Sequence, residues 1–292
     1  MTGSGLLRLF HKFKPEQCGH IVTLRTLPKL LIIYKALKGV SCFQVYGFLY
    51  GINRNKPTTL EVVVDTWPDF KVIICRPDPE KEIHVNTFHS TGLDVSHAPM
   101  LKQVSSDRRV NHKVYTLVHL LYLPDANHLH MPVVDRYNLI IKMHFKLYLC
   151  ISYDFKNTEL ESRISSLNLS HVDLVNKTWK FGGDEKGYRK IENLISNFPS
   201  CCITDSQGQP VSWILVYDYC ALGMLYTLPE HRGKGYAKIV ISTLAKKLHA
   251  EGYPVFCYIE EDNVLSYKLF KNMGFIEDPS YRAAWLEFNF SD

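Results

Sequence analysis

A basic loop with two glycines, His231-Arg-Gly-Lys-Gly235, lies between an apolar run at 222–228 and a strong helical pattern at 235–250. Two glycines after a strand leave backbone N–H groups unobstructed, and the positive end of the helix dipole lies behind them. The histidine, arginine and lysine of the loop add side-chain donors. Such a loop suits a pyrophosphate, so the sequence predicts that a phosphate-bearing cofactor docks here.

The spacing Arg232-x-x-Gly235-x-Ala237 resembles the acyl-coenzyme-A signature of the GNAT N-acyltransferase superfamily. The segment Asn263–Phe275 resembles the next element of that superfamily, where an Asn ends a strand and a helix leads to a Gly-Phe turn. A tight turn with solvated charges remains the alternative for the loop alone, but two such elements in order make it less favoured. The resemblance implies that acyl-CoA binds to Leu225, Tyr226, Leu228, Arg232, Gly233, Lys234, Gly235, Tyr236, Ala237, Asn263, Ser266 and Phe270.

Other segments narrow the resemblance to the glycine N-acyltransferase family. They include Trp67-Pro-Asp-Phe70, Asp173-Leu-Val-Asn176-x-x-Trp179, Gly208-x-Pro210-Val-Ser-Trp213 and Tyr226-Thr-Leu-Pro-Glu, and such segments cover roughly residues 27–80 and 163–290. The resemblance implies an enzyme that moves an acyl group from acyl-CoA to the amino group of glycine or a similar small amino acid, commonly in mitochondria. Acyl-CoA would be a co-substrate, and no cofactor would be bound permanently.

Two positions depart from the family pattern. Active members carry a Glu, the proposed general base, where this chain has Ala221, and many GNAT enzymes place a Tyr where it has Phe270. The general base is therefore not assigned. On a regular strand Tyr219 would share a face with Ala221 and could anchor a water chain, and a bulge could turn Asp218 to that face. Ordinary strand packing is the alternative for both residues.

The missing Glu leaves two functions open. One is an active acyltransferase in which positioning supplies much of the rate and a backbone N–H near Leu225–Tyr226 polarises the thioester carbonyl. The other is a catalytically weak CoA-binding paralogue with a binding or regulatory role. Trp67, Trp179 and Trp213 are candidates for an acyl pocket, with core packing as the more common role.

Composition excludes several other classes. The 292 residues are 46% hydrophobic and 22% charged, as in a globular protein, and a net charge of +5 without a block of Lys or Arg gives no nucleic-acid surface. The eight cysteines form no C-x-x-C pair, which favours a reducing compartment. His128-x-His130 lacks a third ligand, so no metal site is predicted. No apolar run approaches the roughly 20 residues that span a bilayer.

The N-terminus is basic, with Glu16 as the only acidic residue among the first 60. Leu6, Leu7, Leu9, Phe10 and Phe13 alternate with basic residues, as in an amphipathic mitochondrial presequence. We therefore expect a mitochondrial protein, with a disordered basic extension of a cytoplasmic protein as the alternative.

The order of elements predicts a mixed α/β protein, and the resemblance implies a GNAT fold in its C-terminal half. We expect an N-terminal extension at 1–26, an N-terminal domain at 27–160 whose part 82–160 diverges from the family, and an acyl-CoA-binding domain at 161–292. The first half should hold a helix at 30–37, a hairpin of 43–50 with 59–65, and a strand at 71–76. The second should hold helices at 188–198, 235–250 and 264–273 and strands at 201–204, 211–217, 222–228, 255–259 and 283–290. Since both halves begin with helix, hairpin and strand, the first is predicted to be a degenerate second copy of the fold.

Overall fold

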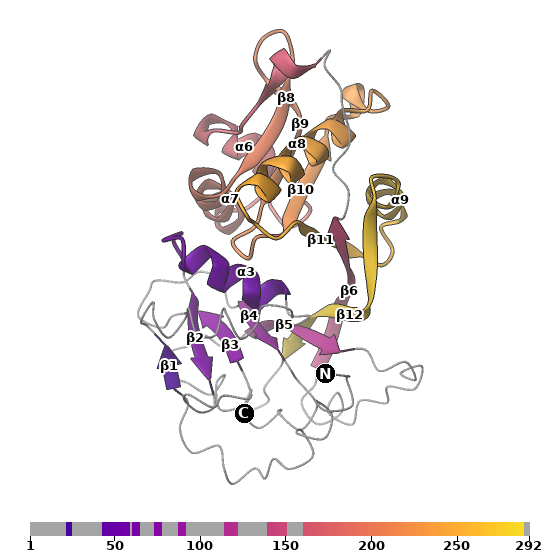
Figure 1. Cartoon of the computed structure of the whole chain (residues 1–292). Helices are drawn as coiled ribbons and strands as arrows, with labels where there is room; N and C mark the ends of the chain where they lie inside the picture. The colour runs from indigo at the N-terminus through magenta and orange to yellow at the C-terminus, as the bar shows by residue number, and fades with distance from the viewer. Residues whose placement is uncertain are drawn as a thin grey trace. The chain divides into compact units, whose positions relative to one another are not determined.

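A computed structural model describes residues 22–24, 43–58, 60–64, 73–77, 87–91, 114–121, 139–150 and 160–288 (Figure 1). The chain divides into two compact units. Unit 1 consists of residues 1–33, 59–144 and 280–292, and unit 2 of residues 34–58 and 145–279. The glycine-bearing loop and both superfamily-like segments lie in unit 2.

Unit 2 contains a six-stranded sheet in the order β6-β11-β10-β9-β8-β7. Its strands are β6 (Leu139–Cys150, of which unit 2 holds the part from Phe145), β7 (Ile164–Ser165), β8 (Ser200–Thr204), β9 (Pro210–Val216), β10 (Leu222–Thr227) and β11 (Phe256–Glu260). Neighbouring strands are antiparallel except β10 and β11, which are parallel.

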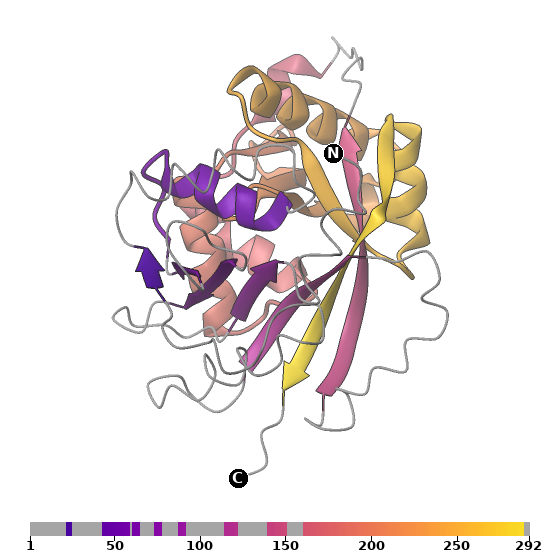
Figure 2. The ribbon, with the colours of Figure 1, turned by 60° about the horizontal axis from the view of Figure 1, so that its bottom comes forward.

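The helices of unit 2 bury both faces of this sheet (Figure 2). They are α3 (Phe43–Ile52), α6 (Val172–Thr178), α7 (Glu185–Asn197), α8 (Tyr236–Ala250) and α9 (Val264–Asn272), with short 3-10 turns η4 (Glu161–Arg163), η5 (Leu169–His171) and η6 (Pro229–His231). All seven residues of β9 are buried, although successive side chains of a strand point to opposite faces. Both α7 and α8 pack on β9, and α8 also packs on β8 and β10.

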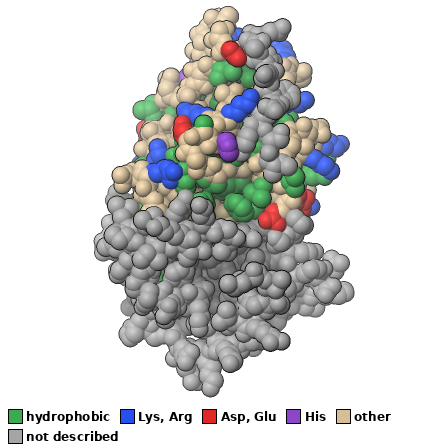
Figure 3. Space-filling model, viewed as in Figure 1, with side chains coloured by type: hydrophobic (Ala, Val, Ile, Leu, Met, Phe, Trp, Pro, Cys, Tyr) green, Lys and Arg blue, Asp and Glu red, His purple; other side chains and the backbone are tan. Residues whose placement is uncertain are grey.

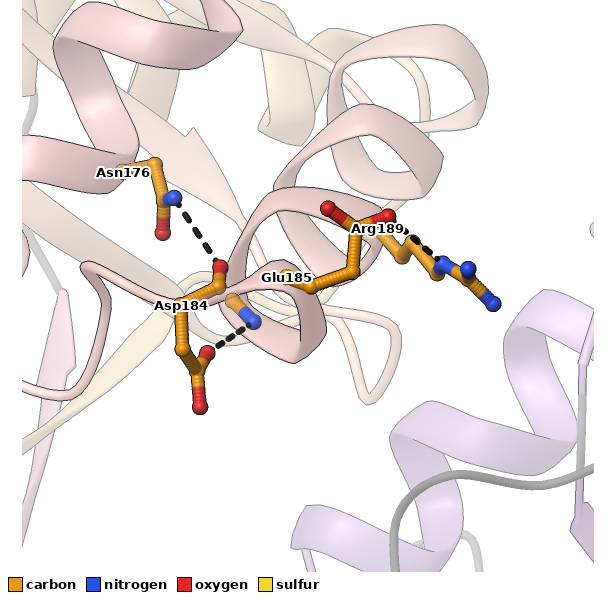
Figure 4. A network of polar contacts seen from close by, with 5 residues as sticks. Asn176, Asp184, Glu185 and Arg189 are labelled. Atoms are coloured by element: carbon orange, nitrogen blue, oxygen red, sulfur yellow. Dashed lines mark hydrogen bonds and ion pairs between the residues drawn. The ribbon is translucent and has the colours of Figure 1, made fainter.

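The segment between α6 and α7 is fixed by polar contacts (Figure 4). The side chain of Asn176 donates from Nδ2 to the Asp184 carbonyl at 3.1 Å and accepts at Oδ1 from the Gly183 N–H at 3.0 Å. The Asp184 carboxylate caps α7 by accepting from the Gly187 N–H at 2.7 Å. Gly182 lies so close to Asn176 that an added Cβ would be 2.3 Å from its carbonyl oxygen. These contacts explain why the sequence here combines Asn, Gly and Asp, and they hold the loop that carries Trp179.

Unit 1 contains a second sheet in the order β1-β2-β3-β4-β5-β12. Its strands are β1 (Val22–Leu24), β2 (Leu60–Val64), β3 (Ile73–Pro77), β4 (Thr87–Thr91), β5 (Val114–Leu121) and β12 (Phe275–Phe288, of which unit 1 holds the part from Ser280). Only β4 and β5 are parallel. The series of pairings is that of unit 2, so the prediction that the first half repeats the fold of the second is confirmed. Each sheet is completed by the last strand of the other half, β12 in unit 1 and β6 in unit 2.

One predicted element is wrong, and the start of another differs from its prediction. Residues 43–50 form the helix α3 rather than one strand of a hairpin. Seven of its ten residues are buried, so the segment shows no helical period, and a short apolar run with aromatic and branched residues cannot be told from a strand by pattern alone. The closing strand, predicted at 283–290, begins at Phe275 and continues through Pro279.

Most other predicted elements are confirmed. The strands predicted near 59–65 and 71–76 are β2 and β3, and those of the second half are β8, β9, β10 and β11. The three predicted helices of that half are α7, α8 and α9. The helix predicted at 30–37, Trp67 and the pair His128 and His130 lie outside the described residues.

Candidate active site

The parallel strands β10 and β11 diverge, and we call the unpaired stretch between their facing edges the slot. They share a single register pair, Leu222 with Cys257, at the start of β10. On the other edge of β10 the register with β9 shifts between Gly223 and Tyr226, and Met224 there has a left-handed φ of 51°. A bulge bends its strand and leaves the extra residue unpaired. Beyond Leu222 the two strands therefore diverge, and the β11-facing edge of β10 has no ladder partner among the described residues.

The glycine-bearing loop begins where β10 ends. Gly233 and Gly235 both have φ of +77°, and a Cβ on either would meet no atom within 4 Å. Glycine is thus favoured by the left-handed backbone and not by lack of space. Gly235 is the N-cap of α8 and supplies no side-chain cap, which leaves N–H groups of the first helical turn without a side-chain acceptor. The loop and the start of its helix, which we call the anion cradle, therefore present backbone N–H groups that could face an anion, and phosphate binding there stays a prediction.

Arg232 is exposed and joins the end of β10 to the loop. Its Nε donates to the Thr227 carbonyl at 3.1 Å, and its guanidinium lies 5.6 Å from the Tyr226 ring centre. On the face drawn in Figure 3, basic side chains are scattered among neutral ones and form no single patch.

Tyr236 anchors the first turn of α8. Its ring is buried, and its hydroxyl accepts from Arg163 Nη1 at 3.2 Å, while Arg163 Nε donates to the Thr204 carbonyl at 2.7 Å. The ring of His231 stacks on it at 6.3 Å. Since the side chain of Tyr236 is used in this way, a contact with a phosphate would come from its backbone N–H.

The other predicted contact residues lie around α9. Asn263 is its N-cap, and Oδ1 accepts from the Ser266 N–H at 3.1 Å. Phe270 is buried against Phe275, with ring centres 4.9 Å apart. The structure therefore gives Asn263 a capping role and Phe270 a packing role.

The floor of the slot is a turn. The Tyr217 N–H donates to the Ala221 carbonyl and the Cys220 N–H to the Tyr217 carbonyl, each at 2.8 Å. Cys220 has a left-handed φ of 65°. The alternative in which Tyr219 and Ala221 share one face of a regular strand therefore does not apply, because the chain reverses between β9 and β10.

Two tyrosines of this turn pack beside the bulge. The ring of Tyr217 covers Gly223, where an added Cβ would lie 2.0 Å from a ring carbon, and it stacks on the Tyr219 ring at 5.1 Å. Burial raises the pKa of Tyr217 well above its usual value, and a hydrogen bond from the side chain of Trp179 opposes this. Burial is the main cause that raises the pKa of Tyr219, and the electrostatic effect of Tyr217 raises it further. Both phenols stay protonated at neutral pH and do not act as bases.

No carboxylate replaces the family Glu at its own position. Ala221 is 1% exposed and offers only a methyl group. Asp218 lies in the same turn, and its buried Oδ1 has no hydrogen-bond partner among the described residues. His, Cys, Asp and Glu side chains of the described residues form no group of three that could hold a metal ion.

The profile of a family described as "Aralkyl acyl-CoA:amino acid N-acyltransferase" matches residues 21–92 and 86–199. The chain belongs to this family. A second profile, "FR47-like protein", matches residues 203–285, which include the slot and the loop. In this acyltransferase the two profiles together cover the sequences of both halves.

Relatives of this acyltransferase align over most of its length. Glycine N-acyltransferase of Rattus norvegicus is 27% identical, over 91% of this chain and 98% of the relative. The human glycine N-acyltransferase is 28% identical, over 83% and 90%.

Solved structures agree with the fold. The crystal structure of a Drosophila protein has a TM-score of 0.69 at 17% identity and covers 92% of this chain and 98% of that one. A tandem GNAT protein from the clavulanic acid biosynthesis pathway has a TM-score of 0.56 at 14% identity, with 94% and 99% covered. The second likeness shows a fold with two GNAT copies, as the matching pairings of the two sheets indicate.

Sequence reasoning missed one polar pair beside the slot of this acyltransferase. Lys180 Nζ donates to Glu260 Oε2 at 2.5 Å, and Glu260 is the last residue of β11. Trp179, the residue before Lys180, is half-buried and packs edge-to-face on Phe181 at 5.7 Å. Trp213, in contrast, is fully buried and stacks on Tyr226 at 5.4 Å, so its role is core packing. Lys180 and Glu260 lie 80 residues apart in the sequence, so no local pattern could have connected them.

The part of the chain that the structure describes contains no helix both long and apolar enough to cross a membrane.

Proposed function

We propose that this protein transfers the acyl group of an acyl-CoA to the amino group of glycine or a similar small amino acid. The observation that carries the proposal is the continuity of the slot with the anion cradle. The strands β10 and β11 diverge after one register pair, and β10 leads directly into the left-handed glycines and the uncapped start of α8. An elongated ligand with a phosphate group at one end fits such a site.

Acyl-CoA would bind with its pyrophosphate on the backbone of Gly233, Gly235 and the first turn of α8. The pantetheine arm would follow the edge of β10 along Leu225, Tyr226 and Leu228, with Arg232 near the phosphates. The start of α9, capped by Asn263, lies beyond the end of β11 and would flank the arm. The remaining predicted contacts, Lys234, Tyr236, Ala237, Ser266 and Phe270, belong to these same elements.

The reaction needs a neutral amine at the thioester. The amine nitrogen attacks the carbonyl carbon, the C–N bond forms, the C–S bond breaks, CoA leaves as its thiol, and one ammonium proton is lost. A backbone N–H at the bulge near Leu225–Tyr226 would stabilise the negative charge on the carbonyl oxygen. Because Ala221 cannot accept the proton, solvent accepts it. A general base of the usual kind would raise the rate by about 10²–10⁴-fold.

A catalytically weak CoA-binding role is the second candidate, favoured by the buried methyl group at position 221. A thiol-release assay with acetyl-CoA, phenylacetyl-CoA and longer acyl-CoAs against a panel of amino acids separates the two. Release that depends on the amino acid supports transfer. Acyl-CoA binding by calorimetry without any release supports the second role, and no binding of any acyl-CoA contradicts both.

We also propose that the protein acts in mitochondria. The support is the composition of the first 60 residues, in which Glu16 is the only acidic side chain. Residues 1–40 fused to a fluorescent reporter should direct it to mitochondria. A diffuse cytosolic signal would favour the cytoplasmic alternative.

A further inference from the structure

A buried glutamine on α3 has no hydrogen-bond partner among the residues that the structure describes. Gln44 is 0% exposed, and neither its Oε1 nor its Nε2 is hydrogen bonded. Buried side-chain amides are nearly always hydrogen bonded, because removing one from water without a new partner is unfavourable. An amide with both its donor and its acceptor end open has the groups to bind a polar ligand.

The helix face that carries Gln44 packs on the turn before β10. Gly47 and Phe48 follow by three and four residues, so they lie on the same face of α3. An added Cβ on Gly47 would lie 1.8 Å from the Tyr219 carbonyl oxygen, and the Phe48 ring lies 5.6 Å from the Tyr219 ring. The glutamine side chain is therefore directed toward the elements that form the floor of the slot.

The same end of α3 also packs on β11. The ring of Phe43 lies 5.4 Å from that of Phe256, which lies 5.7 Å from Tyr258, and Tyr258 lies 6.2 Å from Tyr219. Tyr258 comes one residue after the single register pair between β10 and β11. Gln44 is thus enclosed near the point where the two strands begin to diverge.

We propose that Gln44 binds the carboxylate of the amino-acid acceptor, with Nε2 as the donor. This inference rests on the proposed function and assigns the acceptor end of that same site. Burial raises the pKa of Tyr219, so this neighbour is a neutral phenol and supplies no competing charge. A neutral amide holds a carboxylate without the desolvation that a buried cation would require.

Other parts of the substrates fit Gln44 less well. The phosphates of acyl-CoA belong to the loop that follows β10, whereas Gln44 faces the turn that precedes it. The six residues of β10 separate the two by roughly 20 Å at about 3.3 Å per residue. An apolar acyl chain would leave both ends of the amide unpaired. The carboxylate of the acceptor is the remaining anionic group.

The test is calorimetry on the full chain saturated with free CoA, titrated with glycine, alanine, glutamine and glycinamide. Gln44→Met keeps an unbranched side chain of similar size and removes both polar ends. It should weaken binding of the amino acids about 10- to 100-fold, as loss of a hydrogen bond to a charged group does. Binding of glycinamide, which lacks the carboxylate, should change less than threefold. The affinity for CoA should not change.

Thermal unfolding without ligand provides the second readout. Removing an unpaired amide from a buried site should raise the Tm of Gln44→Met by about 2–4 °C. Gln207→Met makes the same substitution in the exposed turn between β8 and β9 and should change neither the Tm nor the binding. A glutamine with a structural role only would give a lower Tm and unchanged binding of the amino acids.

Each result decides the inference. Unchanged amino-acid affinity in Gln44→Met, or a wild type that binds none of the three amino acids, overturns it. A wild type that binds an amino acid through Gln44 but releases no thiol from any acyl-CoA supports the assignment of Gln44 and contradicts the proposed transfer reaction. The two proposals can therefore fail separately.

Discussion

The two units share one strand order, but their parallel pairs differ. In unit 1, β4 and β5 are joined by four consecutive register pairs, from Thr87 with Tyr115 to Ser90 with Val118. In unit 2, β10 and β11 share only one. The pairing of β4 with β3 runs without a shift, whereas that of β10 with β9 is broken by the bulge at Gly223–Tyr226. The parallel strands therefore diverge in unit 2 and stay paired in unit 1.

Topology alone therefore does not make the site. Both sheets place a parallel pair at the same position, and parallel neighbours normally continue their ladder until one strand ends. What separates β10 from β11 is local, a bulge with Met224 in a left-handed conformation and the ring of Tyr217 over Gly223. The variants below are therefore aimed at the local features of unit 2.

The largest effect should come from Gly235→Asp. The new carboxylate would stand where the phosphates are expected, and its charge would oppose them at the start of α8. Space is free around Gly235, and Asp tolerates a left-handed backbone better than most residues, so the fold should survive. Calorimetry should show acyl-CoA affinity reduced about 100-fold or more.

Gly208→Asp is the matched control for this change. Gly208 also has a left-handed φ, +80°, and open space around it, but it lies in the turn between β8 and β9. The two variants should lose similar stability, about 1 kcal/mol. Only Gly235→Asp should lose acyl-CoA binding, and equal affinities in the two variants would show that the cradle is misplaced.

The next effect concerns the chemistry of the slot. Ala221→Glu restores a carboxylate at the family position and should raise the acyl-transfer rate by about tenfold, mostly below the pKa of the amine, where a base matters most. The gain is less than the usual range for a general base because the turn at 217–221 does not present this position as a regular strand would. Acyl-CoA affinity should change little.

Ala221→Gln, which has the same size and accepts no proton, should leave the rate unchanged. Ala221 is 1% exposed, so burial should raise the pKa of the new carboxyl above that of an unfolded chain. The unfolded state then releases its proton more readily, and the stability cost of Ala221→Glu should grow as the pH rises from about 4 to 8. A rate for Ala221→Glu no higher than for Ala221→Gln would mean that position 221 does not limit the reaction.

The loop and the α8 start could be predicted from sequence because their determinants are local. Gly233 and Gly235 are needed for their own backbone conformation, and the helix dipole acts on the residues next to it. The spacing of Asn, Gly and Asp between α6 and α7 also has a local cause, since Asn176, Gly182 and Asp184 hold one another in place. Local chemistry of this kind is readable without the fold.

The floor of the slot could not be predicted because its contacts are remote in sequence. Gly47 and Phe48 meet Tyr219 only after α3 packs in the unit formed mostly by the second half. The burial of α3 on several sides removed the period that would have marked it as a helix. The bulge gave no signal either, since the left-handed residue is Met224 rather than a glycine.

The smallest effect should come from Met224, and it tests the comparison of the two units most directly. If the bulge keeps β10 apart from β11, a residue at position 224 that disfavours a left-handed φ should narrow the separation of the two strands. Met224→Val introduces such a residue, because a branched Cβ at a φ of 51° is strained by about 1–2 kcal/mol. Met224→Asn is the matched variant, since Asn adopts this conformation readily. We expect Met224→Val to lower the affinity for acyl-CoA about three- to tenfold and to lower the Tm by roughly 2–8 °C.

Met224→Asn should keep the acyl-CoA affinity within about twofold of the wild type, because the backbone and not the methionine side chain sets the opening. Hydrogen exchange of the peptides that contain β10 and β11 gives the structural readout. In Met224→Val a relaxed bulge would let the ladder extend past Leu222, as it does between β4 and β5, and exchange in β10 would slow. Equal losses of affinity in both variants would mean that the methionine side chain contacts the ligand, and the opening of the slot would then need another cause than the bulge.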